Sequence, residues 1–97
     1  MVKHIVFFKL RESTTREQAL ELARNLSDLK GKIPQVRFME VAFDIGRKHN
    51  SHDIALYSHF DDIEALEAYS VHPDHVVVVN QVRQLCETSC KVDYEAE

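Results

Sequence analysis

The sequence predicts an α+β protein with a ferredoxin-like fold: a four-stranded antiparallel sheet with helices on one face. The first observation is the order of its periodic segments, strand-helix-strand-strand-helix-strand. The second is a pair of capping-box patterns, each directly before a segment with apolar residues at helical spacing. The third is length, because 97 residues form a single domain, which we place at 1–97.

The first half of the chain predicts a strand, a helix and a second strand. Residues 2–10 alternate as a strand, and Thr14 with Glu17 predicts the start of a helix that ends at Gly31. Residues 36–45 form the next predicted strand, with Pro34 in the connection. The strand residues assigned to the helix-covered face are Val2, His4, Val6, Phe8, Leu10, Val36 and Phe38. The helix buries Ala19, Leu22, Ala23, Leu26 and Leu29.

The second half repeats this arrangement with a divided helix. Residues 52–60 are the third predicted strand, and Asp61 with Glu64 predicts the next helix start. His72 and Pro73 end that helix, because a residue before proline is pushed out of helical geometry. A further helix follows over 74–86, and a last strand over 89–94. The apolar positions of the two helices are Ile63, Leu66, Ala68 or Tyr69, Val78, Val79, Val82 and Leu85.

The sheet face without helices also contains apolar residues in this assignment. They are Phe7, Met39, Val41, Phe43 and Tyr57. A monomer rarely exposes so large an apolar face, so we expect a homodimer in which two sheets pack together and close a dimeric α/β barrel.

Composition excludes several kinds of partner. The net charge of -4 and scattered basic residues argue against nucleic acid, since phosphate binding needs a basic face. No apolar run approaches a membrane span, and the N-terminal apolar run ends at Lys9 without a cleavage site, so we expect a cytoplasmic protein with no membrane partner. Cys86 and Cys90 lack the spacing of a redox or zinc motif and are interpreted as reduced thiols.

The densest group of chemically capable side chains lies at the divided helix. Tyr69, His72 and His75 surround Pro73, and His4 lies on the helix-covered face of the first strand. A histidine gains or loses a proton near neutral pH, which suits acid–base chemistry. The same side chains also have ordinary structural roles: a buried tyrosine, a helix stop and a core histidine.

The segment Tyr69-Ser70-Val71-His72-Pro73-Asp74-His75-Val76, together with Val2-Lys3-His4-Ile5-Val6 and Val92-Asp93-Tyr94, resembles the stress-responsive A/B barrel domain family. The resemblance covers nearly the whole chain and implies a dimeric α+β barrel. Members include plant heat-stable proteins and a polyketide cyclase, while most have no assigned reaction.

The resemblance also implies site residues. Tyr69 and His75 would be the catalytic pair, in a pocket between sheet and helices that His4, His72 and Leu26 line. Leu26 stands where the cyclase has a further pocket tyrosine, so substrate or reaction would differ. The ligand would be a small carbonyl-bearing molecule, and the chemistry an aldol condensation with His75 as base and Tyr69 as hydrogen-bond donor.

Two function classes therefore stay open: an enzyme or binder using this pocket, and a structural or stress-associated homodimer without catalysis. We expect no cofactor and no side-chain metal site, because Pro73 breaks the helix that would align His72 and His75. Some relatives hold a cation on backbone carbonyls, which by position would lie near Lys30, Ile33 and Val36. Carbonyl ligands leave no side-chain pattern, so the sequence leaves this open.

Overall fold

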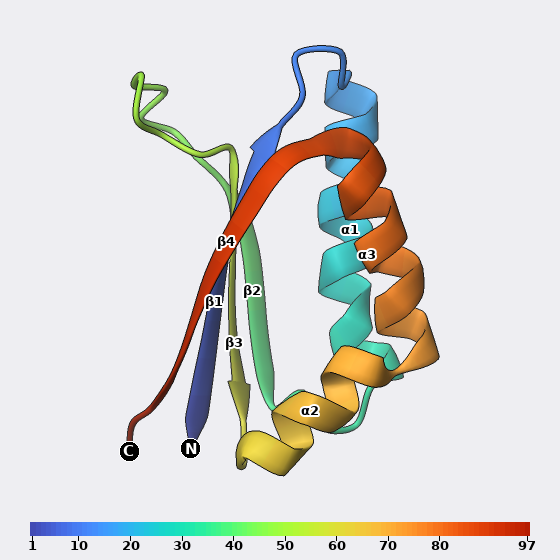
Figure 1. Ribbon diagram of the computed structural model, residues 1–97, viewed down its shortest axis with the longest axis vertical. Helices are drawn as coiled ribbons and strands as arrows, with labels where there is room; N and C mark the ends of the chain where they lie inside the picture. The colour runs from blue at the N-terminus through green and yellow to red at the C-terminus, as the bar shows by residue number, and fades with distance from the viewer.

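The computed structural model describes all residues, 1–97, as one sheet covered on one face by helices (Figure 1). The elements follow the predicted order, with two helices between the third and fourth strands. They are β1 (Val2–Leu10), α1 (Arg16–Lys32), β2 (Phe38–Phe43), β3 (Ile54–Phe60), α2 (Ile63–Val71), α3 (Pro73–Leu85) and β4 (Cys86–Glu95). No helix combines the length and the apolar character needed to cross a membrane.

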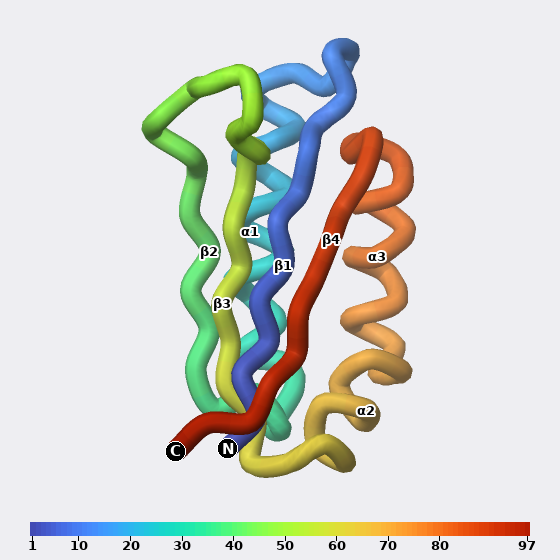
Figure 2. Tube along the Cα trace, turned by 60° about the vertical axis from the view of Figure 1, so that its left-hand side comes forward, coloured from blue at the N-terminus to red at the C-terminus, as the bar shows by residue number.

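The strands lie in the order β2-β3-β1-β4, and all neighbours are antiparallel (Figure 2). This order is the ferredoxin-like arrangement, so the predicted fold class is confirmed. β1 lies in the interior of the sheet, with β4 beside it as an edge strand. α1 and α3 lie side by side over the helix-covered face, and α2 crosses one end (Figure 1).

The core fills the layer between this face and the helices. Alternation on β1 and β3 is as predicted, and the predicted apolar stripe of α1 is buried at four of its five positions, with Ala23 half-buried. The core residues are Val2, Phe8, Leu22, Leu26, Leu29, Ile33, Val36, Ile54, Leu56, Phe60, Leu66, Tyr69, Val78 and Cys86. Burying side chains of this size supplies most of the driving force for folding.

The predicted face of β2 is wrong. Antiparallel partners share a face, and Met39 pairs with Ser58 while Val41 pairs with Leu56, both of which are buried beneath the helices. Phe43 likewise pairs with buried Ile54. The prediction counted alternation from Val36, but the Val36 N–H closes a turn on the Ile33 carbonyl and the strand begins only at Phe38.

The face without helices, called the open face below, is nevertheless apolar. Phe7 and Tyr57 lie on it as predicted, and Phe38, Val92 and Tyr94 join them by register. Exposed fractions of 45% for Phe7 and 52% for Val92 are high for such side chains. The apolar character therefore holds, although three of its five predicted members lie on the other face.

Both helix starts differ from the prediction by one residue. Thr15 caps α1 and forms the capping box with Gln18, because the Thr14 hydroxyl instead donates to the Leu85 carbonyl at 2.6 Å. Asp62, and not Asp61, caps α2 by accepting the Ala65 N–H. Asp61 is used in an ion pair with Arg37.

The remaining boundaries differ slightly. α1 continues through Gly31 to Lys32, with Ile33 as its C-cap. β4 begins at Cys86, immediately after α3, and is four residues longer than the predicted 89–94. Cys86 is buried, Cys90 is exposed, and both are free thiols.

Candidate functional site

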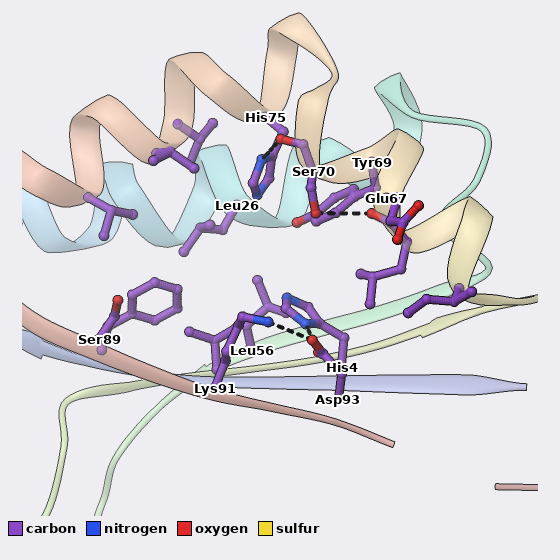
Figure 3. A pocket seen from close by; sticks show the side chains of 17 residues that line it. His4, Leu26, Leu56, Glu67, Tyr69, Ser70, His75, Ser89, Lys91 and Asp93 are labelled. Atoms are coloured by element: carbon purple, nitrogen blue, oxygen red, sulfur yellow. Dashed lines mark hydrogen bonds and ion pairs between the residues drawn. The ribbon is translucent and has the colours of Figure 1, made fainter. Parts of the chain in front are cut away.

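A cavity of about 410 Å³ lies between the helix-covered face of the sheet and the three helices (Figure 3). Its wall is mainly apolar, which suits a small organic molecule. Four of the five predicted site residues line it: His4 from β1, Leu26 from α1, Tyr69 from α2 and His75 from α3. Residues more than sixty positions apart in the sequence therefore meet at one cavity.

The break between α2 and α3 brings Tyr69 and His75 together. Tyr69 lies in the last turn of α2, and Pro73 occupies the first turn of α3, where its missing N–H costs nothing. The chain reverses at this point, so the rings of Tyr69 and His75 pack against each other, with centroids 4.4 Å apart and planes tilted by 49°. The Tyr69 ring also packs on the Phe60 ring, with centroids 5.0 Å apart, and this contact holds the Tyr69 ring above the sheet.

His75 is held with one nitrogen free. Its Nδ1 lies 3.0 Å from the Ser70 carbonyl oxygen, so Nδ1 carries the proton and donates it to that bond. In the neutral ring Nε2 then has the lone pair of a base. Burial is the largest cause that lowers the pKa of His75. The nearby His4 and His72 lower it further, while the hydrogen bond to Ser70 raises it by less. His75 is therefore neutral at pH 7.

The Tyr69 hydroxyl is a hydrogen-bond donor, in contrast to the basic Nε2 of His75. Burial alone raises the pKa of Tyr69, with no charged group or hydrogen-bond partner contributing. The side chain is only 1% exposed, yet it lines the cavity. The hydroxyl therefore stays protonated and retains a donor for a molecule in the cavity.

His4 approaches the cavity from the sheet. Its Nδ1 bonds to Asp93 Oδ1 at 2.5 Å, and the other oxygen of Asp93 accepts Lys91 Nζ at 2.6 Å. Burial raises the pKa of Asp93, but the hydrogen bonds from Lys91 and His4 outweigh it and leave that pKa below its ordinary value. Asp93 is therefore an ionised carboxylate that orients the His4 ring.

Three further residues that the sequence did not predict line the cavity: Asp93, Lys91 and Ser89. All three lie on one face of β4, and register pairs them with His4, Val6 and Phe8. Alternation on the predicted last strand puts the three on a common face, but only the pairing with β1 identifies that face as the helix-covered one.

His72 does not line the cavity, so its prediction as a pocket residue is wrong. It lies in the corner between α2 and α3, where its Nδ1 accepts the Asp74 N–H at 3.1 Å and caps α3. A histidine between two helices is free to serve as the cap of the second, and that local role takes its ring away from the cavity.

No group of three or more His, Cys, Asp or Glu side chains is arranged to hold a metal ion. At the turn after α1, where the resemblance implies a cation on carbonyl oxygens, the Ile33 carbonyl accepts the Val36 N–H at 3.1 Å. The Gln35 Oε1 atom at this turn is buried without a partner. An oxygen without a hydrogen-bond partner fits such a cation, and Gln35 would be one of the residues that hold it.

The fold and the cavity define a class of protein, small α+β barrels that carry a pocket between sheet and helices. The chain belongs to the stress-responsive A/B barrel domain family, whose profile matches residues 2–96. It is 35% identical over 97 residues to an uncharacterised protein of Streptomyces coelicolor, covering 98% of this chain and 99% of that one.

Two further relatives are informative. Olivetolic acid cyclase of Cannabis sativa is 26% identical over 98 residues, covering 96% of this chain and 94% of the cyclase. Among solved structures, a dimeric protein of unknown function with a ferredoxin-like fold from Bacteroides fragilis is 34% identical, with a TM-score of 0.84. That match covers 98% of this chain and 95% of the other.

Proposed function

We propose that the protein binds a small carbonyl compound in this cavity and catalyses proton transfer at the carbon beside the carbonyl, as in an aldol-type cyclisation. The observation that supports this best is the hydrogen bond from His75 Nδ1 to the Ser70 carbonyl. It leaves Nε2 without a partner, on a ring that packs against the Tyr69 ring at the cavity wall. The relationship to olivetolic acid cyclase supports the same chemistry.

The roles follow from the protonation states. His75 Nε2 removes a proton from the carbon next to the carbonyl. The electron pair of that C–H bond forms the C=C bond of an enolate, and the π pair of the carbonyl moves onto its oxygen. The Tyr69 O–H donates a hydrogen bond to this oxygen as it gains negative charge. A neutral histidine and a protonated tyrosine are the forms that this step needs, and burial favours both.

We also propose that the working unit is a homodimer formed through the open face and located in the cytoplasm. Phe7, Val92 and Tyr94 leave an apolar surface that a second copy would cover. The Bacteroides fragilis relative is described as dimeric, which supports this assembly. The two free thiols suit a reducing compartment. A homodimer without catalysis is the alternative function.

The test is hydrogen exchange at the methyl group of acetophenone in D₂O, followed by NMR. We expect the protein to accelerate exchange and His75→Ala to lower the rate by about 100-fold, which is typical of losing a general base. His49→Ala is the matched control, because His49 is exposed on the β2–β3 hairpin and does not line the cavity. Equal rates for wild type and His75→Ala would favour the homodimer without catalysis.

A further inference from the structure

The β4 wall of the cavity contains a group that the proposed proton transfer does not use, the Lys91 ammonium. Lys91 pairs with Val6 across β1 and β4, so it lies on the helix-covered face of the sheet. Figure 3 shows its side chain rising from β4 beside His4 and Asp93. The side chain is 62% exposed, which places the ammonium where the cavity opens to solvent.

Lys91 retains hydrogen-bonding capacity in this position. An ammonium has three N–H donors, and Lys91 uses one for Asp93 Oδ2 at 2.6 Å. Both oxygens of Asp93 are occupied, since Oδ1 accepts His4. Asp93 therefore fixes the place of the ammonium and leaves two of its N–H groups for another molecule.

The cavity also has two carboxylates, on different walls. Asp93 on β4 is paired with His4 and Lys91. Glu67 on α2 takes part in none of the ion pairs of the structure, so its carboxylate repels an anion near α2. Apart from histidines, Lys91 is the only basic residue that lines the cavity.

Ser89 adds a second donor on the same wall. It lies two residues before Lys91 on β4, and alternation puts both on one face of the strand. The two remaining N–H groups of Lys91 and the Ser89 hydroxyl suit the two acceptor oxygens of a carboxylate. A phosphate group has more charge and more acceptor oxygens than these two groups satisfy.

We propose that Lys91, with Ser89 beside it, determines specificity by binding a carboxylate of the ligand, so that the substrate class is keto acids. This inference depends on the proposed function, because it assumes that the carbonyl group occupies the cavity near Tyr69 and His75. The carboxylate lies at the cavity opening, and the apolar part of the ligand contacts the wall between them.

The test compares two ligands that differ only in charge, benzoylpropionate and its primary amide. Binding to the full-length protein is measured by NMR titration at low salt. We expect the carboxylate to bind wild type about fivefold more tightly than the amide, the strength of a partly exposed ion pair. Lys91→Gln should abolish this preference and leave amide affinity unchanged. The preference should also decrease as salt is added.

Lys30→Gln is the control, because Lys30 is exposed on α1 away from the cavity and its removal changes net charge equally. It should keep the full preference for the carboxylate. If wild type binds the amide as tightly as the carboxylate, the Lys91 inference is wrong while the proposed carbonyl pocket stands. If neither compound binds wild type, the pocket proposal fails together with it.

Discussion

At the scale of single residues, the proposed role of His75 as the base predicts how the exchange rate depends on pH. Burial lowers the pKa of His75, so the free base persists below its ordinary value of 6.5. We expect the exchange rate to rise with pH through a midpoint below 6.5, because protonated His75 has no lone pair to accept the substrate proton. The measurement is a pH profile of the acetophenone reaction. A midpoint at or above 6.5 would contradict the burial of the working base.

The lowered pKa of His75 also makes the free energy of unfolding depend on pH. A lowered pKa in the folded state means that the unfolded chain binds the proton more readily. The contribution of His75 to stability is therefore complete above pH 6.5. It is lost as the pH falls through the lower pKa that His75 has in the folded state. Urea unfolding between pH 7 and about pH 5 should show stability decreasing towards acid, and His75→Asn should flatten that slope. An unchanged slope would assign the pH dependence to other groups.

Substituting Tyr69 should separate the proposed catalysis from stability. Its hydroxyl has no protein partner, so Tyr69→Phe removes no internal hydrogen bond and should change the free energy of unfolding by less than about 1 kcal/mol. The exchange rate should nevertheless fall by about 100-fold, because the developing oxyanion loses its donor. Thermal melting and the exchange assay measure the two effects. A large loss of stability with unchanged turnover would mean that the hydroxyl is structural.

At the scale of elements, the corner between α2 and α3 positions the site. His72 ends one helix and caps the next, and the corner brings Ser70 within hydrogen-bonding distance of His75. Replacing the cap by alanine leaves the Asp74 N–H without its partner, so His72→Ala should cost about 1 kcal/mol. Asparagine is itself a good cap, and His72→Asn should preserve most of that stability.

Comparing these two variants by urea unfolding tests the capping role. Because neither change touches the cavity wall, the wild-type exchange rate should survive in His72→Asn. Equal destabilisation by both substitutions would show that the imidazole packs in the corner and does not act through its hydrogen bond.

The elements also indicate how far the sequence predicts the structure. Alternation and helical spacing are local properties, so β1, β3 and the buried stripe of α1 could be predicted. Helix caps depend on competition between neighbours: Thr14 precedes Thr15, but its hydroxyl bonds to Leu85, 71 residues away. That contact exists only after folding, and it moves the capping box by one residue.

The site shows the same division between local and long-range information. Tyr69 and His75 flank a proline, so their closeness could be expected from the sequence, whereas Asp93 and Lys91 reach the cavity only through the register of β4 on β1. The prediction of which β2 residues face the helices is wrong for a related reason. A turn at Val36 interrupts the alternation, and no residue type marks the point where the strand begins.

At the scale of the whole molecule, the two faces of the sheet have different surroundings. The helix-covered face holds the core and the cavity, while the open face exposes Phe7, Val92 and Tyr94 without a cover. The cavity lies on the helix-covered face and the proposed interface on the open face, so we expect dimerisation to cover the open face.

Assembly through the open face can be tested at Phe7. Phe7 lies on β1, in the interior of the open face, and is 45% exposed. Phe7→Glu would place an unpaired carboxylate in the proposed interface, which is costly to bury, so we expect a folded monomer by sedimentation velocity at micromolar concentration. Val77→Glu is the control, because Val77 is 67% exposed on α3 and should leave the dimer intact. Val41→Asp should instead unfold the protein, since Val41 packs against the core beneath the helices. A wild-type monomer at the same concentration would overturn the homodimer, and a dimeric Phe7→Glu variant would move the interface away from the open face.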